Sequence, residues 1–284
     1  MKTMKSKFYS LALAAGMLSL TACSDDNTND SNNDKGNGIE NGSILKGTIT
    51  EDVTLKAGNT YKLSGEYIVE AGATLNIEEG VKIISVYDNI VDYILVKQGA
   101  KINAVGTPDK PIVMTSEKEE PGAWGGIHIC GKAHTNAEGG KGSSEIGGAV
   151  YGGNDDADNS GTLQYIRLEY TGFAFDEEHE ANGISFYGVG NGTIVDHCEA
   201  YKGSDDGFEF FGGSVNVSNM VVVSCSDDSF DWTEGWNGKG TDLVAYQEAK
   251  ATLGYDCDCL IEADNNENDN AATPVSHPVL KNLI

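Results

Sequence analysis

The sequence predicts an all-β fold in which each internal repeat forms one coil of a parallel β-helix, or β-solenoid. Three observations indicate this fold: the sequence repeats itself, each repeat contains short runs of alternating apolar residues, and no amphipathic helix pattern appears in its body. Stacked coils pair strand on strand and bury a continuous ladder of like side chains. The 36 glycines suit the tight corners between the strands.

In the N-terminal half, the sequence repeats at a shift of 27 along the chain. Residues 72–77 (GATLNI) match residues 99–104 (GAKINA), and an apolar strand precedes each segment, at 67–69 and 94–96. Period-2 alternation that is punctuated by glycine, asparagine or aspartate is typical of short β-strands separated by turns. We therefore expect these segments to be equivalent strands of neighbouring coils.

The repeats in the C-terminal half are shorter. Residues 204–210 (SDDGFEF) recur as residues 226–232 (SDDSFDW) at a shift of 22, and residues 183–186 lie one coil earlier at a shift of 24. Residues 162–170 match residues 193–201 at a shift of 31, which includes an inserted loop. Since each shift should equal the length of one coil, we expect coil lengths in the range 22–31. The expected core stack consists of Phe186, Phe210 and Trp232.

A β-sandwich or a β-propeller is the alternative fold, because short strands with glycine turns also build those architectures. Both depend on regular hairpins between consecutive strands. Hairpin signals are scarce in this sequence, and the β-solenoid is therefore the favoured prediction.

The N-terminus has the layout of a bacterial export signal. Three lysines precede an apolar run at residues 8–20, which is too short for a permanent transmembrane helix. The ending Leu20-Thr21-Ala22-Cys23 resembles the lipobox of bacterial lipoproteins, whose cysteine carries the lipid. We therefore expect a signal peptide at 1–22, lipidation of Cys23, a flexible polar tether at 23–44 and the β-helix domain at 45–284. The alternative is an ordinary secretory signal with a chance cysteine.

The start of the tether and the charge of the chain bear on location and partners. Ser24-Asp25-Asp26 resembles the export tag of Bacteroidetes lipoproteins, which predicts an outer membrane lipoprotein facing the cell exterior; the periplasmic leaflet is the alternative. The formal net charge of −25 repels nucleic acid and anionic lipid surfaces. We therefore expect membrane attachment through the lipid on Cys23, no nucleic-acid partner, and a neutral glycan, calcium or another protein as ligand.

Segments at both ends of the body resemble one protein family. Residues 72–80, 106–116 and 124–127 are similar to the opening coils of right-handed parallel β-helix lipoproteins of the pectate-lyase-like type, which are common in Bacteroidetes. Residues 205–211 and 227–236 are similar to their later coils. The resemblance implies a right-handed coil and a surface location, but no particular activity. Because the last residues read as the start of a further strand, we also expect the final coil to lack a C-terminal cap.

Two Asp-Asp turns carry the best candidates for a functional site. If the phenylalanines of each repeat point inward, alternation sends Asp205, Glu209, Asp227 and Asp231 outward onto one face. Neighbouring coils lie about 4.8 Å apart, so Asp205 should stack on Asp227 and Glu209 on Asp231. An all-oxygen ligand set of this charge suits calcium. The alternatives are aspartates that only stabilise the corner, or an acid–base pair of a polysaccharide hydrolase.

Three aromatic residues beside this face suit the binding of a neutral sugar. Tyr187 has the outward parity of its strand, Tyr201 lies near the next corner, and Trp236 lies in a glycine-containing loop. These residues predict a cell-surface, lipid-anchored module that binds or adheres to glycans.

The alternative function is a polysaccharide-degrading hydrolase or lyase that uses Asp205, Glu209, Asp227 and Asp231 as its catalytic carboxylates. The Gly-His-Gly and Arg-Ile-Lys segments of polygalacturonases are absent from the sequence. Arg167 is the only arginine, and no aspartate pair lies near it in the sequence. The known β-helix chemistries are therefore not favoured.

The lipobox predicts that Cys23→Ala abolishes labelling of the protein by a radioactive or clickable fatty acid and releases it from the membrane fraction. The physical reason is that the thiol of Cys23 is the atom to which the lipid attaches. Continued labelling of the Cys23→Ala variant would show that the protein carries no lipid at this position.

Overall fold

The computed structural model describes residues 38–284 except residue 89 and residues 176–178. The predicted signal peptide, Cys23 and most of the predicted tether lie outside the described residues. The β-helix begins before residue 45, the boundary expected from composition, because β1 (Gly38–Ile39) already pairs in parallel with β3 (Val53–Leu55). Within the described part of the chain, no helix is both long and apolar enough to cross a membrane.

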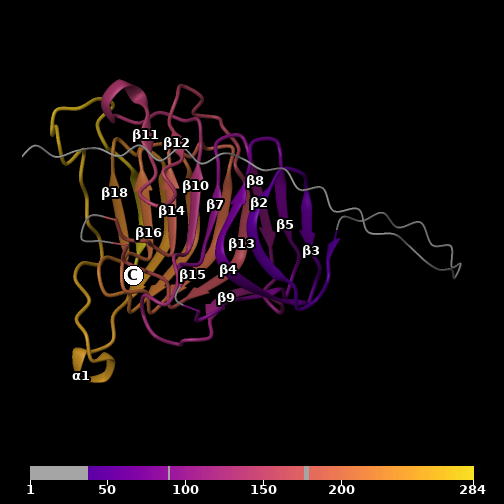
Figure 1. Ribbon diagram of the computed structural model, residues 1–284. Coiled ribbons are helices and arrows are strands. Elements are labelled where there is room, and N and C mark those ends of the chain that lie inside the picture. Colours follow the sequence, from indigo (N-terminus) through magenta and orange to yellow (C-terminus); the bar gives the residue numbers. More distant parts are fainter. Residues whose placement is uncertain (1–37, 89, 176–178) are drawn as a thin grey trace, which may run out of the picture. The chain divides into compact units, whose positions relative to one another are not determined.

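The described residues form a right-handed parallel β-helix (Figure 1). Eighteen of their strands join one sheet, and all the ladders in this sheet are parallel. Two further strands, β11 (Gly142–Ser143) and β12 (Val150–Tyr151), form an antiparallel hairpin, and the one α-helix in this part of the chain is α1 (Lys250–Leu253). The remaining strands are β2 (Ile44–Ile49), β4 (Thr60–Val69), β5 (Thr74–Ile77), β6 (Lys82–Ser85), β7 (Tyr93–Val96), β8 (Lys101–Val105), β9 (Ile112–Ser116), β10 (Ile127–Cys130), β13 (Gly161–Glu169), β14 (Ile184–Tyr187), β15 (Ile194–Tyr201), β16 (Phe208–Phe211), β17 (Asn216–Val223), β18 (Phe230–Thr233), β19 (Lys239–Tyr246) and β20 (Val279–Leu283).

The strand register confirms most of the repeats. Tyr67 of β4 pairs with Ile94 of β7, at the predicted shift of 27. Ile184 pairs with Phe208, and Phe208 pairs with Phe230, at the predicted shifts of 24 and 22. Equivalent residues of neighbouring coils therefore lie directly over one another.

Several coil lengths differ from those expected, and shifts of 16 between β1 and β3 and of 33 between β7 and β10 already lie outside the expected range. Leu163 of β13 pairs with Val195 of β15, a shift of 32 rather than 31. A shift of 31 would align buried Leu163 with Ile194, which is 51% exposed, and would turn the apolar side chains to the wrong face. Ile127 pairs with Ile184, so this coil has a shift of 57, outside the expected range of 22–31. The excess is an insertion at 131–160 that contains the β11–β12 hairpin.

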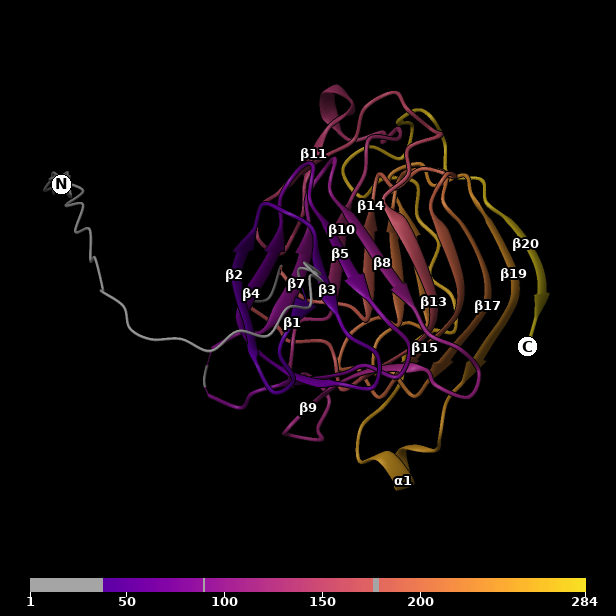
Figure 2. The same ribbon diagram turned by 90° about the vertical axis from the view of Figure 1, so that its right-hand side faces the viewer.

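Each coil contributes strand segments to three faces, which Figure 2 shows from a second direction. The first face consists of β7, β10, β14, β16 and β18, stacked in this order along the axis. The strands that precede them in the chain also stack on one another, from β6 through β9, β13 and β15 to β17. The connections between these two faces therefore lie at a single corner of the solenoid. We call it the entry corner, and it consists of the described residues within 86–92, 117–126, 170–183, 202–207 and 224–229.

Stacked aromatic rings fill the core behind the first face. The rings of Phe186 and Phe210 are nearly parallel, with centroids 5.1 Å apart. Trp232 is the register partner of Phe210, as predicted, but the ring that stacks on Phe210 at 4.2 Å belongs to Trp236. The loop after β18 folds back under the coil, so Trp236 is 1% exposed and closes the aromatic stack.

The predicted further strand at the C-terminal end is β20. It pairs in parallel with β19 and continues the coil stack, while Val279 and Leu283 remain 59% and 48% exposed. Among the strands that the structure describes, none pairs with the outer edge of β20.

The aromatic stack predicts a large stability cost for Phe210→Ala. The substitution opens a cavity between Phe186 and Trp236, and we expect the free energy of unfolding to fall by about 3–5 kcal/mol in urea denaturation. Ile194→Ala is the matched control, because Ile194 is 51% exposed and its truncation should cost little. A loss below about 1 kcal/mol for Phe210→Ala would mean that the ring does not pack in the core.

Candidate functional site

A pocket of about 210 Å³ opens on the outer side of the first face, at its entry corner. Among its lining residues, nine carry carboxylates, the tenth is Asn182, and none is lysine, arginine or histidine. We call this cavity the acidic pocket. Its carboxylates are Glu145, Glu180, Asp205, Asp206, Glu209, Asp227, Asp228, Asp231 and Glu262.

One column of carboxylates follows directly from the strand register. Glu209 of β16 pairs with Asp231 of β18, as predicted. An isolated parallel bridge between Phe230 and Ile261 adds the next coil and places Glu262 after Asp231 in the same column. Alternation along each strand turns these three side chains outward while the phenylalanines point into the core.

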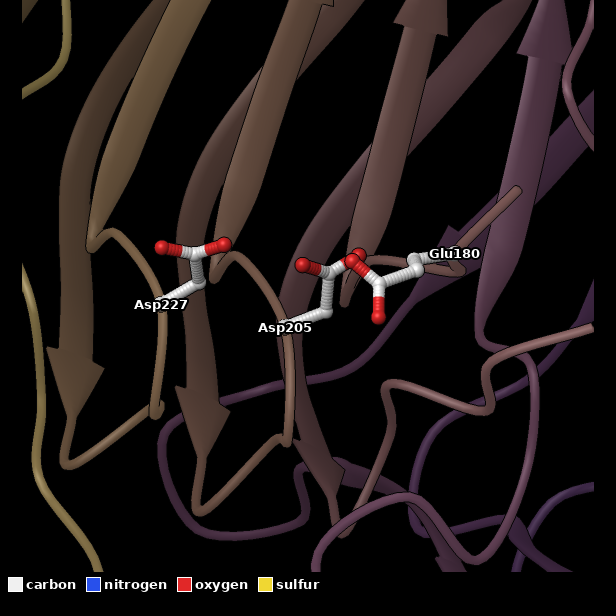
Figure 3. Close-up of side chains that lie close together, drawn as sticks. All are labelled: Glu180, Asp205 and Asp227. Carbon is white, nitrogen blue, oxygen red and sulfur yellow. The ribbon is translucent and has the colours of Figure 1, made fainter. Parts of the chain in front are cut away.

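A second column lies on the entry corner, where Glu180, Asp205 and Asp227 face one another (Figure 3). One carboxylate oxygen from each residue lies within 4.8 Å of the other two. Asp205 and Asp227 occupy equivalent turns of neighbouring coils, as predicted, while Glu180 comes from the connection before β14. Glu180 is exposed, Asp227 is half-buried and Asp205 is buried, so this column runs from the rim of the pocket to its wall.

The second aspartate of each Asp-Asp pair has a different task from the first. The backbone N–H of Asp228 donates to Asp206 Oδ1 at 2.9 Å, and the N–H of Cys259 donates to Asp228 Oδ1 at 2.7 Å. One coil earlier, the N–H of Asp206 donates to Asn182 Oδ1 at 3.2 Å. Asn182, Asp206 and Asp228 therefore form a side-chain ladder that joins each corner to the next coil. Asp206 and Asp228 therefore stabilise the corner, which is the alternative that the sequence left open for these turns.

Backbone packing at this corner leaves no room for larger residues. A Cβ atom on Gly183 would lie 2.3 Å from the carbonyl oxygen of Gly207, and a Cβ atom on Gly207 would lie 2.7 Å from the carbonyl oxygen of Ser229. Both approaches are closer than real side chains allow. Glycine before β14 and β16 is therefore needed for coils to stack closely enough to bring the carboxylates together.

Burial raises the pKa of the carboxyl groups on the pocket wall. The pKa of Asp205 rises to about 8, first through loss of water and then through the charges of Glu180 and Asp227. Burial likewise raises the pKa of Glu209 well above its usual range, with further increases from nearby carboxylates, and raises that of Asp231 to about 6. Without a cation, some of these groups therefore hold a proton at neutral pH.

Two rim carboxylates, which were not predicted, come from segments far away in the sequence. Glu145 precedes the β12 strand of the insertion, and burial raises its pKa to about 7. Glu262 lies in the segment after α1, and its hydrogen bond with Asp228, followed by partial burial, raises its pKa to about 7. No local repeat marks either residue, so only the folded chain reveals them.

Two of the three aromatic residues that the sequence predicts for sugar binding are buried, and that prediction is wrong for them. Tyr187 does lie on the outer side of β14, but it is fully buried, because the β11–β12 hairpin covers it and Tyr151 packs against it at 5.2 Å. Trp236 lies in the core, where its indole N–H donates to the carbonyl of Val215 at 3.2 Å. Neither ring is open to a sugar.

Tyr201 is half-buried and lies away from the acidic pocket, since it is not among the lining residues. The Arg167 guanidinium lies 4.5 Å from the centre of its ring, and Lys202 Nζ lies 5.1 Å from it. Arg167 is itself paired with Glu169 and Glu199. The ring is therefore both half-buried and flanked by two cations of the chain, so little of its surface is open to a sugar.

The carboxylates of the acidic pocket can hold divalent cations. Four groups of three residues each bring one oxygen per residue within 4.8 Å of the others. All their ligands are oxygens, which calcium prefers at flexible coordination numbers of about six to eight. Asp231 Oδ1 is buried and has no hydrogen-bond partner among the described residues. The four groups are Glu180/Asp205/Asp227, Asp206/Asp227/Asp228, Asp206/Glu209/Asp231 and Asp228/Asp231/Glu262.

The profile of a family described as "Pectate-lyase like beta helix domain" matches residues 47–284. No curated protein matches the sequence. Among solved structures, the catalytic unit of a thermostable GH87 α-1,3-glucanase from Streptomyces thermodiastaticus strain HF3-3 aligns at 12% identity with a TM-score of 0.29. The alignment covers 84% of this chain and 50% of that structure.

The raised pKa values predict that stability falls as pH rises when no divalent cation is present. Unfolded carboxyl groups titrate near about pH 4, whereas Asp231, Glu145 and Asp205 titrate at about 6, 7 and 8 in the folded protein. The folded state therefore binds more protons between these values, and stability is lost as pH rises through the folded pKa values.

We expect the melting temperature in EDTA to decrease steadily from about pH 5 to about pH 8. Asp205→Asn should flatten this decrease, because asparagine keeps the shape of the side chain and cannot ionise. A melting temperature that stays constant or rises over this range would contradict the pKa shifts.

Proposed function

We propose that this chain, which belongs to the family of pectate-lyase-like β-helix domains, is a calcium-dependent carbohydrate-binding protein. The acidic pocket is its binding site. Carboxylates of the pocket hold one or more calcium ions, and the ions together with rim oxygens bind the hydroxyl groups of a polysaccharide.

The observation that carries the proposal is the uncompensated charge of the pocket. Nine carboxylates surround one cavity, and its lining contains no basic side chain. Like charges this close either hold protons or recruit a cation. A bound divalent cation removes the repulsion in the column of Glu180, Asp205 and Asp227 without requiring any of them to be protonated.

Calcium would also leave room for a ligand. Three protein carboxylates do not fill a coordination shell of about six to eight oxygens, and the remaining positions can accept water or sugar hydroxyls. Glu180 and Glu262 at the exposed rim offer further hydrogen-bond acceptors to a sugar. A neutral polysaccharide fits this site best, because the field of the pocket repels an acidic chain wherever calcium does not bridge the charges.

We place this activity at the cell surface. The support comes from the lipobox at Cys23 and from the polar segment that follows it, which together describe a lipid-anchored domain on a tether. A binding site on such a domain would hold extracellular polysaccharide against the outer membrane.

A second candidate function is hydrolysis of the bound polysaccharide. The observation that favours it is the hydrogen bond between the neighbours Glu209 and Asp231. Burial raises the pKa of both groups, and the hydrogen bond between them then raises that of Glu209 and lowers that of Asp231, so the shared proton stays on Glu209. A protonated and an ionised carboxyl group in one site are what acid–base catalysis needs. A lyase reaction is disfavoured, because no lysine, arginine or histidine lines the pocket to abstract a proton.

The calcium site predicts that calcium raises the melting temperature and that chelator lowers it. A cation bound only by the folded state stabilises it by about 2.7 kcal/mol at a hundredfold excess over its dissociation constant. Asp227→Asn should remove most of this effect, because one ligand loses its charge while its shape is kept. Asp196→Asn is the matched control, since Asp196 lies on β15 outside the acidic pocket.

Scanning fluorimetry with calcium from micromolar to millimolar concentration checks this prediction, with magnesium as a comparison ion. A melting temperature that does not change with calcium would show that these carboxylates hold no calcium.

The same purified protein on a glycan array, with and without calcium, followed by analysis of soluble products, separates the two functions. Retention of intact chains supports binding, whereas release of shortened oligosaccharides supports hydrolysis.

A further inference from the structure

A second cavity, of about 350 Å³, lies on the same entry corner as the acidic pocket. Its walls come from the first three connections of that corner, and the lining residues are Val86, Tyr87, Asp88, Ile90, Val91, Lys118, Gly122, Ala123 and Phe173. We call it the aromatic pocket, because Tyr87 and Phe173 form part of its lining. Neither the family match nor the proposed calcium site accounts for it.

The aromatic pocket presents an open ring beside fixed polar groups. Tyr87 is 61% exposed, and Lys118 Nζ lies 5.0 Å from the centre of its ring. The lysine is also paired with Glu120 at 2.9 Å. Asp88, next to the ring, accepts hydrogen bonds from Ser64 Oγ at 2.9 Å and from the N–H of Ile90 at 3.1 Å. A sugar ring can pack on an aromatic face while its hydroxyls contact such polar neighbours.

The two pockets lie at the same corner but at different levels of the coil stack. The connection with Tyr87 enters β7, and the connection with Asp227 enters β18, four coils further along the first face. At about 4.8 Å per coil, this separation is roughly 19 Å, which a short oligosaccharide can span.

A single hairpin connects the pockets. Phe173 lines the aromatic pocket, and Glu180 lines the acidic pocket, while an antiparallel bridge between Ala174 and Glu180 holds the two parts of this connection together. Between them, Phe175 is 41% exposed, and its ring packs against that of Phe173 at 5.2 Å. The exposed ring of Phe175 therefore extends the aromatic surface of the pocket beyond Phe173.

We propose that the aromatic pocket is a second carbohydrate subsite, and that one neutral polysaccharide chain lies along the entry corner from Tyr87 to the calcium-loaded acidic pocket. The inference rests on the proposed function and adds to it the direction of the chain and its minimum length. The ligand is neutral, because the one lysine of the aromatic pocket is already paired and the acidic pocket carries nine carboxylates.

The test compares short with long ligands on the full chain in millimolar calcium. The probes are disaccharides and octasaccharides from neutral glucans, mannans and xylans, and affinity is measured by isothermal titration calorimetry. Tyr87→Ala should weaken the best octasaccharide about tenfold and leave the corresponding disaccharide unchanged, because only the longer chain reaches the aromatic pocket. Tyr246→Ala is the matched control, since Tyr246 is 58% exposed and lines neither pocket.

The outcomes separate this inference from the proposed function. If Tyr87→Ala binds octasaccharides as tightly as the unaltered protein while Asp227→Asn loses both calcium and sugar, the aromatic subsite is wrong and the acidic site stands. If the unaltered protein binds none of the octasaccharides in calcium, the proposed function and the subsite are both wrong. Calcium titration of the same samples shows whether the ion site itself remains.

Discussion

Parallel, in-register stacking of coils is the constraint on which the rest of the structure depends. Because each strand pairs with its equivalent one coil away, every side chain lies about 4.8 Å from a neighbour at the same position. In the interior, this rule places Phe186 over Phe210 and builds the aromatic core. On the outside, the same rule places Glu209 beside Asp231, although their charges repel. The same stacking that stabilises the fold therefore also brings the carboxylates of the acidic pocket close enough to repel one another.

The fold could be predicted from the sequence because its repeats are nearly exact where the coils are short. In the coils with shifts of 22 and 24, alternation alone gave the correct inward and outward residues, and Asp205 and Asp227 came together as expected. The prediction failed where the chain leaves the coil. One extra residue between β13 and β15 changed the register, and the insertion at 131–160 greatly lengthened one coil.

The candidate site could be predicted only in part, for the same reason. Its wall belongs to the repeats, but Glu145 comes from the insertion and Glu262 from the segment beyond α1, and no periodicity connects them to the wall. Asp206, which the sequence did not single out, also lines the pocket, and its side chain accepts a hydrogen bond from the backbone N–H of Asp228 at the next corner. Tyr187 has the predicted outward parity, yet the β11–β12 hairpin lies over it. Strand alternation predicts the direction of a side chain, but it does not predict which other part of the chain packs over it.

The Asn182, Asp206 and Asp228 ladder has a consequence for how such a site can arise and change. Each rung is supplied by one coil and accepts a backbone hydrogen bond from the next coil, so the ladder is built from contacts between neighbouring coils. Duplication of a single short coil would therefore insert one more rung together with one more set of outward carboxylates, already in register. Gene duplication within the array can in this way lengthen the binding surface by whole coils, without redesign of the fold that holds it.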